Sequence, residues 1–109
     1  MKNYLGLAAL LVLGSASVGL AADAKANWDE MCAKCHGSAG AGDTKMGKKL
    51  NLRDLTDAKV QAQFTDADAF KAMKDGLKDK EGKLKMKAME GLSDDDIRAL
   101  VAYVRGLKK

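Results

Sequence analysis

Proline is absent from this chain of 109 residues, and histidine, cysteine, arginine and aromatic side chains are scarce. One histidine and two cysteines are too few nitrogen and sulfur ligands for a zinc site, which needs about four. Three arginines, two tyrosines and one tryptophan do not make the interleaved basic and aromatic surface of a nucleic-acid binder. The composition therefore argues against a zinc protein and against a nucleic-acid partner.

Charge is missing from residues 5–22, directly after a short start that carries Lys2. A basic start, an apolar middle and then small residues are the layout of a secretory signal peptide. A retained membrane anchor is the alternative, since an uncharged run of about 18 residues reaches the lower limit for a span, but the Gly, Ala and Ser content favours a signal peptide. We expect cleavage after Ala21, or within about three residues of it. Residues 1–22 are thus predicted to be removed, leaving residues 23–109 as one exported domain without stable membrane insertion.

The expected domain is so small that its apolar core alone gives little stability. A chain of about 85 residues has an apolar core that supplies only a few kcal/mol, so it usually needs a further stabiliser. Cys32 and Cys35 are so close in the sequence that a disulfide between them would close a tiny loop and would stabilise the fold weakly. A bound cofactor is the natural candidate.

Helical spacing is the regular pattern of the exported part, and no segment shows sustained two-residue alternation, so the prediction is an all-α fold. A first helix is expected from about Ala24 to Ala33, with Asn27 as a good N-cap residue. Residues 36–56 are rich in glycine and are predicted to be a loop. Val60 and Phe64 mark a short helical segment.

Two further helices are predicted from their caps and apolar stripes. One follows a cap at Thr65 or Asp66, and the last follows Ser93. Their stripes consist of Phe70, Met73 and Leu77 in the first, and of Ile97, Leu100, Val101, Val104 and Leu107 in the second. Met73 is therefore assigned to the core.

Residues 31–37 read MCAKCHG and contain a CxxCH motif at the end of the first expected helix, which is the attachment signature of c-type haem. Residues three apart on a helical turn face the same side, so two thiols can add across the two vinyl groups on one haem edge, and the next residue can reach the iron. Cys32 and Cys35 are predicted to hold one covalent haem c, and His36 is predicted to bind its iron. Export agrees with this interpretation, since c-type haem is attached outside the cytoplasm in bacteria.

Two interpretations without haem compete with this one. A thioredoxin-like dithiol would need a strand before the motif and a βαβ context, which the helical pattern does not supply. A structural dithiol protein without haem is the other alternative.

The chain resembles the class I cytochromes c, specifically the small exported bacterial members with a single haem. The resemblance rests on Trp28 four residues before the first cysteine, on CAKCHG, on the Gly-rich GAGDTKMGKKL, and on KMKAMEGLSDDDIRALVAYVRGL. It implies the cytochrome c fold, in which the N- and C-terminal helices pack crosswise and short helices and loops surround one covalently bound haem. The helix contact of the family corresponds to Ala24 and Trp28 against Leu100 and Tyr103.

The missing proline is a departure from this family. Its members usually have a proline in the loop after the histidine, where a backbone carbonyl accepts the ring N–H of the iron ligand, and often another just after the methionine ligand. Here the corresponding stretches read MGKK, residues 46–49, and MKA, residues 86–88. A carbonyl near Gly47 or Lys48 can still accept the bond, since proline contributes rigidity and not the acceptor itself. The loop without proline is expected to release its sulfur more readily.

A methionine is the expected second iron ligand, because the chain has no second histidine and a soft thioether suits haem iron. Met31 adjoins the attachment site, Met73 belongs to a helical stripe, and Met46 lies in the loop expected on the histidine side. Met86 and Met89 remain. The family places the ligand just after a lysine and shortly before the LS that starts the last helix, which selects Met86 and leaves Met89 as the alternative.

A haem with histidine and methionine ligands has no open position for a substrate. The resemblance therefore implies a one-electron carrier of the periplasm, monomeric and not an enzyme, that exchanges electrons with a donor and an acceptor protein. The alternative is a haem enzyme or a small-ligand sensor with a labile distal ligand.

Lysines flank both segments that are expected to cover the haem. They are Lys34, Lys45, Lys48 and Lys49 on one side and Lys83, Lys85 and Lys87 on the other. They form either an ordinary solvated surface or a rim that steers the protein to an acidic patch on a redox partner. Arg53 is expected either to pair with a haem propionate or to be a surface charge.

Overall fold

The computed structural model describes residues 23–109, and the predicted signal peptide, residues 1–22, lies outside the described residues. Residues 23–27 are α-helical and continue into the π-helical segment η1 (Trp28–Cys32) and into α2 (Ala33–His36). The following elements are α3 (Lys45–Lys49), α4 (Ala58–Gln61), α5 (Asp66–Asp75), β1 (Leu77–Lys78), β2 (Leu84–Met86) and α6 (Asp94–Gly106). The predicted all-α class is confirmed, with one small hairpin added.

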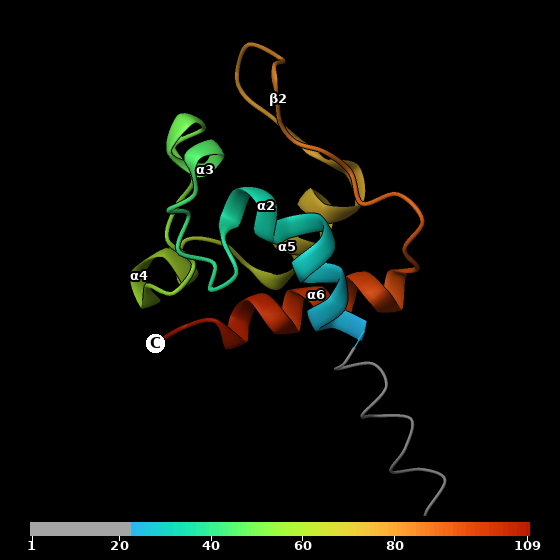
Figure 1. The fold of residues 1–109 in the computed structure, drawn as a ribbon. Helices are drawn as coiled ribbons and strands as arrows, with labels where there is room; N and C mark the ends of the chain where they lie inside the picture. Colours follow the sequence, from blue (N-terminus) through green and yellow to red (C-terminus); the bar gives the residue numbers. More distant parts are fainter. Residues whose placement is uncertain (1–22) are drawn as a thin grey trace, which may run out of the picture.

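The N-terminal helical segment crosses α6, as Figure 1 shows. The buried core at this crossing joins Trp28 and Cys32 to the α6 residues Ile97, Leu100, Val101 and Val104, and Met73 of α5 completes it. Ala24 is also buried. The rings of Trp28 and Tyr103 lie 5.6 Å apart between centroids, inclined by 38°. The crosswise packing expected from the family is therefore present, and the assignment of Met73 to the core is confirmed.

The first helix is longer than predicted and has a different start. It continues to His36 instead of ending near Ala33, and Asn27 lies inside it with helical backbone angles (φ −64°, ψ −40°) and no side-chain cap bond. The prediction of Asn27 as an N-cap is wrong because the helix already begins at residue 23, so the N–H groups of the residues after Asn27 have helical carbonyls as acceptors. The π-turn, in which the N–H of Ala33 donates to the carbonyl of Trp28, follows directly.

The caps of the last two long helices are confirmed. Thr65 and Asp68 form a capping box at the start of α5, and each of their two hydrogen bonds is 3.0 Å long. Ser93 and Asp96 form a second one at the start of α6, with two bonds of 3.1 Å. In each box, two side-chain oxygens accept from two backbone N–H groups at a helix start, where such groups otherwise lack acceptors.

The segments between the helices differ from the prediction at two places. Helix α5 ends at Asp75, and Leu77, predicted as part of its stripe, lies in β1 with 47% of its surface exposed. β1 and β2 form an antiparallel hairpin that pairs Leu77 with Met86. Within the predicted loop 36–56, α3 forms a short helix whose N-cap is Thr44, which accepts a 2.9 Å bond from the N–H of Gly47.

Gln61 is a buried polar residue between α4 and α6. Its Nε2 donates to the carbonyl of Leu55 at 2.7 Å and to the carbonyl of Val104 at 2.8 Å. Both amide protons therefore have acceptors, which a buried side-chain amide requires.

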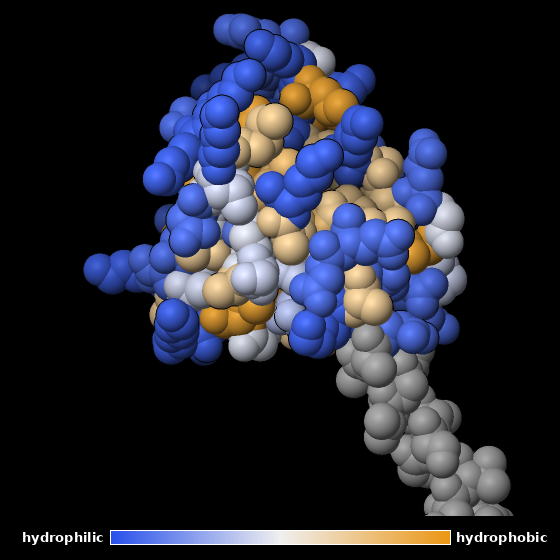
Figure 2. Space-filling model, viewed as in Figure 1, coloured by the Kyte–Doolittle hydropathy of each residue, from blue (hydrophilic) through white to orange (hydrophobic). Residues whose placement is uncertain are grey.

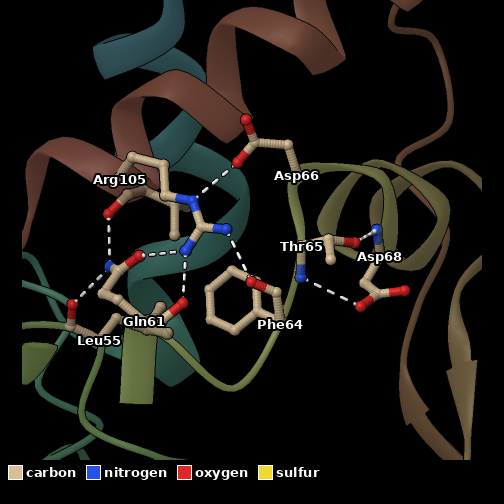
Figure 3. A network of polar contacts seen from close by, with 8 residues as sticks. Leu55, Gln61, Phe64, Thr65, Asp66, Asp68 and Arg105 are labelled. Carbon is tan, nitrogen blue, oxygen red and sulfur yellow. Dashed lines mark hydrogen bonds and ion pairs between the residues drawn. The ribbon is translucent and has the colours of Figure 1, made fainter. Parts of the chain in front are cut away.

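Arg105 of α6 extends this network to the connection before α5 (Figure 3). Its guanidinium donates to the Asp66 carboxylate at 2.7 Å, to the Gln61 carbonyl at 2.6 Å and side-chain oxygen at 2.9 Å, and to the Phe64 carbonyl at 2.7 Å. It also lies 4.5 Å from the centre of the Phe64 ring. The C-terminal helix is thus tied to the α4–α5 connection by polar and aromatic contacts. Among residues 23–109, no helix has the length and apolar character that a bilayer crossing requires.

Candidate functional site

The CxxCH residues lie where the first helix turns toward the glycine-rich segment. Cys32 ends η1 and is buried, with 4% of its surface exposed, whereas Cys35 and His36 of α2 are half-buried. Both cysteines are free thiols. Gly37 ends α2 with a positive φ of 88°, and its N–H donates to the carbonyl of Ala33 at 2.8 Å. The three side chains are therefore presented from adjacent turns of one helical segment.

His36 has a buried ring nitrogen that lacks a partner. Its Nδ1 finds no hydrogen-bond partner among the described residues, and the ring lies 5.7 Å from that of Trp28 between centroids, inclined by 35°. Burial lowers the pKa of His36, which favours the neutral imidazole that binds metals. The expected acceptor near Gly47 or Lys48 does not appear in the described residues. A buried nitrogen without a partner is uncommon in a folded protein and points to a function of the ring.

Helix α3 packs backbone to backbone against the motif. The Thr44 hydroxyl donates to the carbonyl of Cys35, and the N–H of Gly42 donates to the carbonyl of His36 at 2.8 Å. A Cβ at Gly47 would lie 2.5 Å from the Gly42 oxygen and 2.7 Å from the Cys35 oxygen. The carbonyls of the motif are thus fixed by the segment that follows it.

The pKa of the Cys32 thiol is raised to about 11, first by burial and second by the nearby Cys35. Redox-active CxxC pairs instead depend on a lowered thiol pKa, because the thiolate is the reactive form. The environment of Cys32 therefore argues against a thioredoxin-like dithiol.

Met86 and Met89 both contact the buried cluster that includes Cys32 and Met73. Met86 ends β2, and the N–H of Met89 donates to the carbonyl of Met73 at 2.7 Å. Met31 and Met46 are exposed, at 39% and 43%. The structure therefore brings both candidate sulfur ligands onto the buried cluster that contains Cys32 and leaves the choice between them open.

The seven lysines of the predicted rim are all exposed. The ion pairs found among the described residues involve other basic side chains. Figure 2 shows hydrophilic side chains around stretches of apolar surface on the face in view. Arg53 is exposed and donates to the side-chain oxygen of Gln63, and both of its expected roles stay predictions.

Sequence reasoning missed two residues that shape the site. Thr44 binds the Cys35 carbonyl, and Gly76 lies against the backbone of Met86. The sequence contains a signal for Thr44, because threonine is a preferred N-cap residue. It contains no signal for the contact of Gly76, which depends on the hairpin that follows it.

The cytochrome c family model matches residues 21–108, which is most of the chain. The chain belongs to the cytochrome c family. Among solved structures, it is similar to the KustC0563 c-type cytochrome, with 31% identity and a TM-score of 0.66 over 78% of this chain and 96% of that one. The comparison with curated proteins found no match. As a cytochrome c, the protein binds covalent haem c, and its size fits one haem.

The residues present fit this cofactor. The motif supplies two free thiols and a neutral imidazole whose Nδ1 lacks a partner. Large apolar side chains are also exposed, namely Met31, Met46, Leu50, Leu77 and Leu84, at 37% to 51%. Membership of the family removes the alternative of a dithiol protein without haem.

Proposed function

We propose that the protein is a diffusible one-electron carrier whose haem is attached at Cys32 and Cys35 and ligated by His36 and Met86. The observation that carries this proposal is that Met86 and Met89 both pack on the buried cluster that contains Cys32. The choice of Met86 rests on its position just after a lysine and shortly before the last helix, as in the family. Bound haem supplies a ferric–ferrous couple that accepts and returns single electrons.

The roles of the chain follow from the chemistry of its side chains. His36 offers a neutral nitrogen because burial opposes its protonation. The Met86 thioether is a soft ligand that favours the reduced state and so raises the reduction potential. Two protein ligands leave no open position for a substrate, which favours electron transfer over catalysis.

The distal ligand is tested with a pair of variants of the haem-loaded protein. Met86→Ala is expected to lose the long-wavelength charge-transfer band of methionine-ligated ferric haem and to have a lower reduction potential. Met89→Ala is expected to keep the band, since Met89 is proposed to pack at the site and not to bind iron. The reverse pattern would identify Met89 as the ligand.

A haem enzyme or small-ligand sensor with a labile methionine is the second candidate. The absence of proline from residues 84–92 favours it, because no proline restricts the backbone of that segment. Carbon monoxide distinguishes the two functions. The native ferrous carrier is expected to bind it poorly, whereas rapid binding at neutral pH would favour the sensor or enzyme.

We further propose that residues 1–22 are removed on export and that the carrier works in the periplasm as a monomer. The support is the charge pattern of the sequence, since these residues lie outside the described structure. The mass of the protein recovered from a periplasmic fraction tests this: loss of about 22 residues is expected. The full mass in a membrane fraction would indicate a retained anchor.

The partners are proposed to be a donor and an acceptor protein with acidic docking patches. The support is that the lysines around both segments are exposed and lie outside the ion pairs of the described residues. Such a surface increases the rate of encounter with an acidic partner more than the final affinity.

A further inference from the structure

We propose that the C-terminal end of α5, through Gly76 and the carbonyl of Met73, positions Met86 as the iron ligand. This inference rests on the proposed ligation by Met86. Gly76 caps α5 with φ 82° and ψ 176°, and its own N–H donates to the carbonyl of Ala72 at 2.9 Å. Its backbone position is thus set by the helix that precedes it.

The segment that contains Met86 approaches Gly76 through its backbone. A Cβ on Gly76 would lie 2.8 Å from the Met86 oxygen and 3.1 Å from the Ala88 nitrogen. These are main-chain atoms, which cannot rotate away as a flexible side chain would. A side chain at residue 76 would therefore displace the backbone of residues 86–88.

Two further contacts connect this displacement to the sulfur ligand. Leu77, the residue after Gly76, pairs with Met86 across the hairpin. The N–H of Met89 donates to the carbonyl of Met73 in the last turns of α5 at 2.7 Å. The segment 86–89 is therefore held to the end of one helix at Met86 itself and at Met89, by main-chain contacts that restrain it in the absence of a proline.

Two other glycines serve as controls, because they share the positive φ of Gly76 but not its close contact with the backbone. Gly82 and Gly91 both have φ 81°, close to that of Gly76, but a Cβ on either would meet nothing within 4 Å. Alanine is disfavoured at a positive φ, so all three alanine variants are expected to lose some stability. Only at residue 76 does the added methyl group also push on the ligand segment.

The test compares Gly76→Ala, Gly82→Ala and Gly91→Ala as haem-loaded proteins, with haem content measured by the pyridine haemochrome assay. Gly76→Ala is expected to lose the methionine charge-transfer band, or to lose it in guanidinium well before the helices unfold, and to have a lower reduction potential. The two controls are expected to keep the wild-type band and potential. Retention of both by Gly76→Ala, or equal loss in all three variants, would overturn the proposal.

The Met86→Ala background separates this proposal from the function on which it rests. There, Gly76→Ala is expected to leave the potential unchanged, because the ligand is already gone. If Met86→Ala itself keeps the band, the proposed ligation is wrong. If Met86→Ala loses the band while Gly76→Ala behaves as the wild type does, the ligation stands and the role of Gly76 is wrong.

A second variant applies if Gly76→Ala does not accumulate as folded protein. Met89→Pro removes the N–H that binds the Met73 carbonyl, and Met89→Ala retains it. The proline variant is expected to lose the band at a lower guanidinium concentration than the alanine variant. Equal behaviour of the two would contradict positioning by α5.

Discussion

At Gly47, helix α3 comes so close to the CxxCH segment that there is no room for a side chain. A Cβ would meet the oxygens of Gly42 and Cys35 at 2.5 Å and 2.7 Å. Gly47→Ala is expected to lower the free energy of unfolding by about 1–3 kcal/mol, the usual range for overpacking a tight contact. Guanidinium unfolding of the haem-loaded variant, followed by circular dichroism, measures this change.

Gly106→Ala is the matched control, because Gly106 is also a helical glycine and has nothing within 4 Å of its Cβ position. Its substitution is expected to be neutral or to stabilise the protein by at most about 1 kcal/mol. Equal losses in the two variants would mean that the contact with the motif is not the cause.

Single residues were predictable where their chemistry is local. The CxxCH pattern indicated covalent haem, and membership of the family confirms that cofactor. Met73 was recognised as core by its helical spacing. The unpartnered Nδ1 of His36 and the tight contact at Gly47 were not predictable, because each depends on how segments distant in sequence or separated by turns pack together.

Among the helices, α5 begins with a capping box whose strength depends on pH. The pKa of Asp68 lies below its ordinary 3.8, first because its carboxylate accepts the backbone N–H of Thr65. A lowered carboxyl pKa stabilises the fold at pH values above the unfolded-state pKa, and this contribution is lost as the pH falls through the folded-state value. The loss of folding stability at acid pH should therefore depend in part on Asp68.

Asp68→Asn is expected to have a shallower loss of melting temperature than the wild type as the pH is lowered from about 5 toward 3. Melting curves over a series of pH values measure the slope. Glu90→Gln, an exposed acidic residue outside the capping boxes, serves as the control for the change in charge. A slope for Asp68→Asn equal to that of the wild type would exclude a contribution of this cap.

Helices and strands, like single residues, were predictable where the signal is local in the sequence. The starts of α5 and α6 were predicted because a capping box and an apolar stripe are contained in a few neighbouring residues. The hairpin and α3 were missed because two or three strand residues, or one turn of helix, leave no period in the sequence. The prediction extended α5 too far because Leu77 is apolar and fits the helical spacing, whereas in the structure Leu77 pairs with Met86 in the hairpin.

The whole molecule is expected to depend on its cofactor for folding. Its buried apolar side chains come from the crossing of the first helix with α6 and from Met73 of α5, and five large apolar residues stay exposed. The double variant Cys32→Ala, Cys35→Ala cannot attach haem and is expected to be largely unfolded. Native helix content by circular dichroism together with a cooperative melt would contradict this expectation.

The lysine surface predicts a salt-dependent encounter. Lys48→Glu, Lys49→Glu is expected to lower the rate of electron transfer with an acidic partner by on the order of tenfold at low ionic strength. The difference should shrink as salt screens the charges over about 10 Å at 0.1 M. Stopped-flow kinetics over a series of salt concentrations measures this, and rates that do not change with salt would exclude steering.

Lys108→Glu is the control for that series. Lys108 is exposed, follows the end of α6 and is not one of the seven lysines of the rim. Its reversal changes the net charge without altering the lysine rim, so its effect on the rate is expected to be smaller.

The bonds of Arg105 to Gln61 have a further consequence for the chain between them. They join residues 44 positions apart, and the segment that they close contains Met86. Closing a loop restricts the conformations of everything inside it, which is how a disulfide restrains an unfolded chain. With both cysteines in the CxxCH motif, this chain has none to spare for such a bridge. The guanidinium therefore restrains, without a covalent bond, the conformations of the segment that contains Met86, the proposed iron ligand.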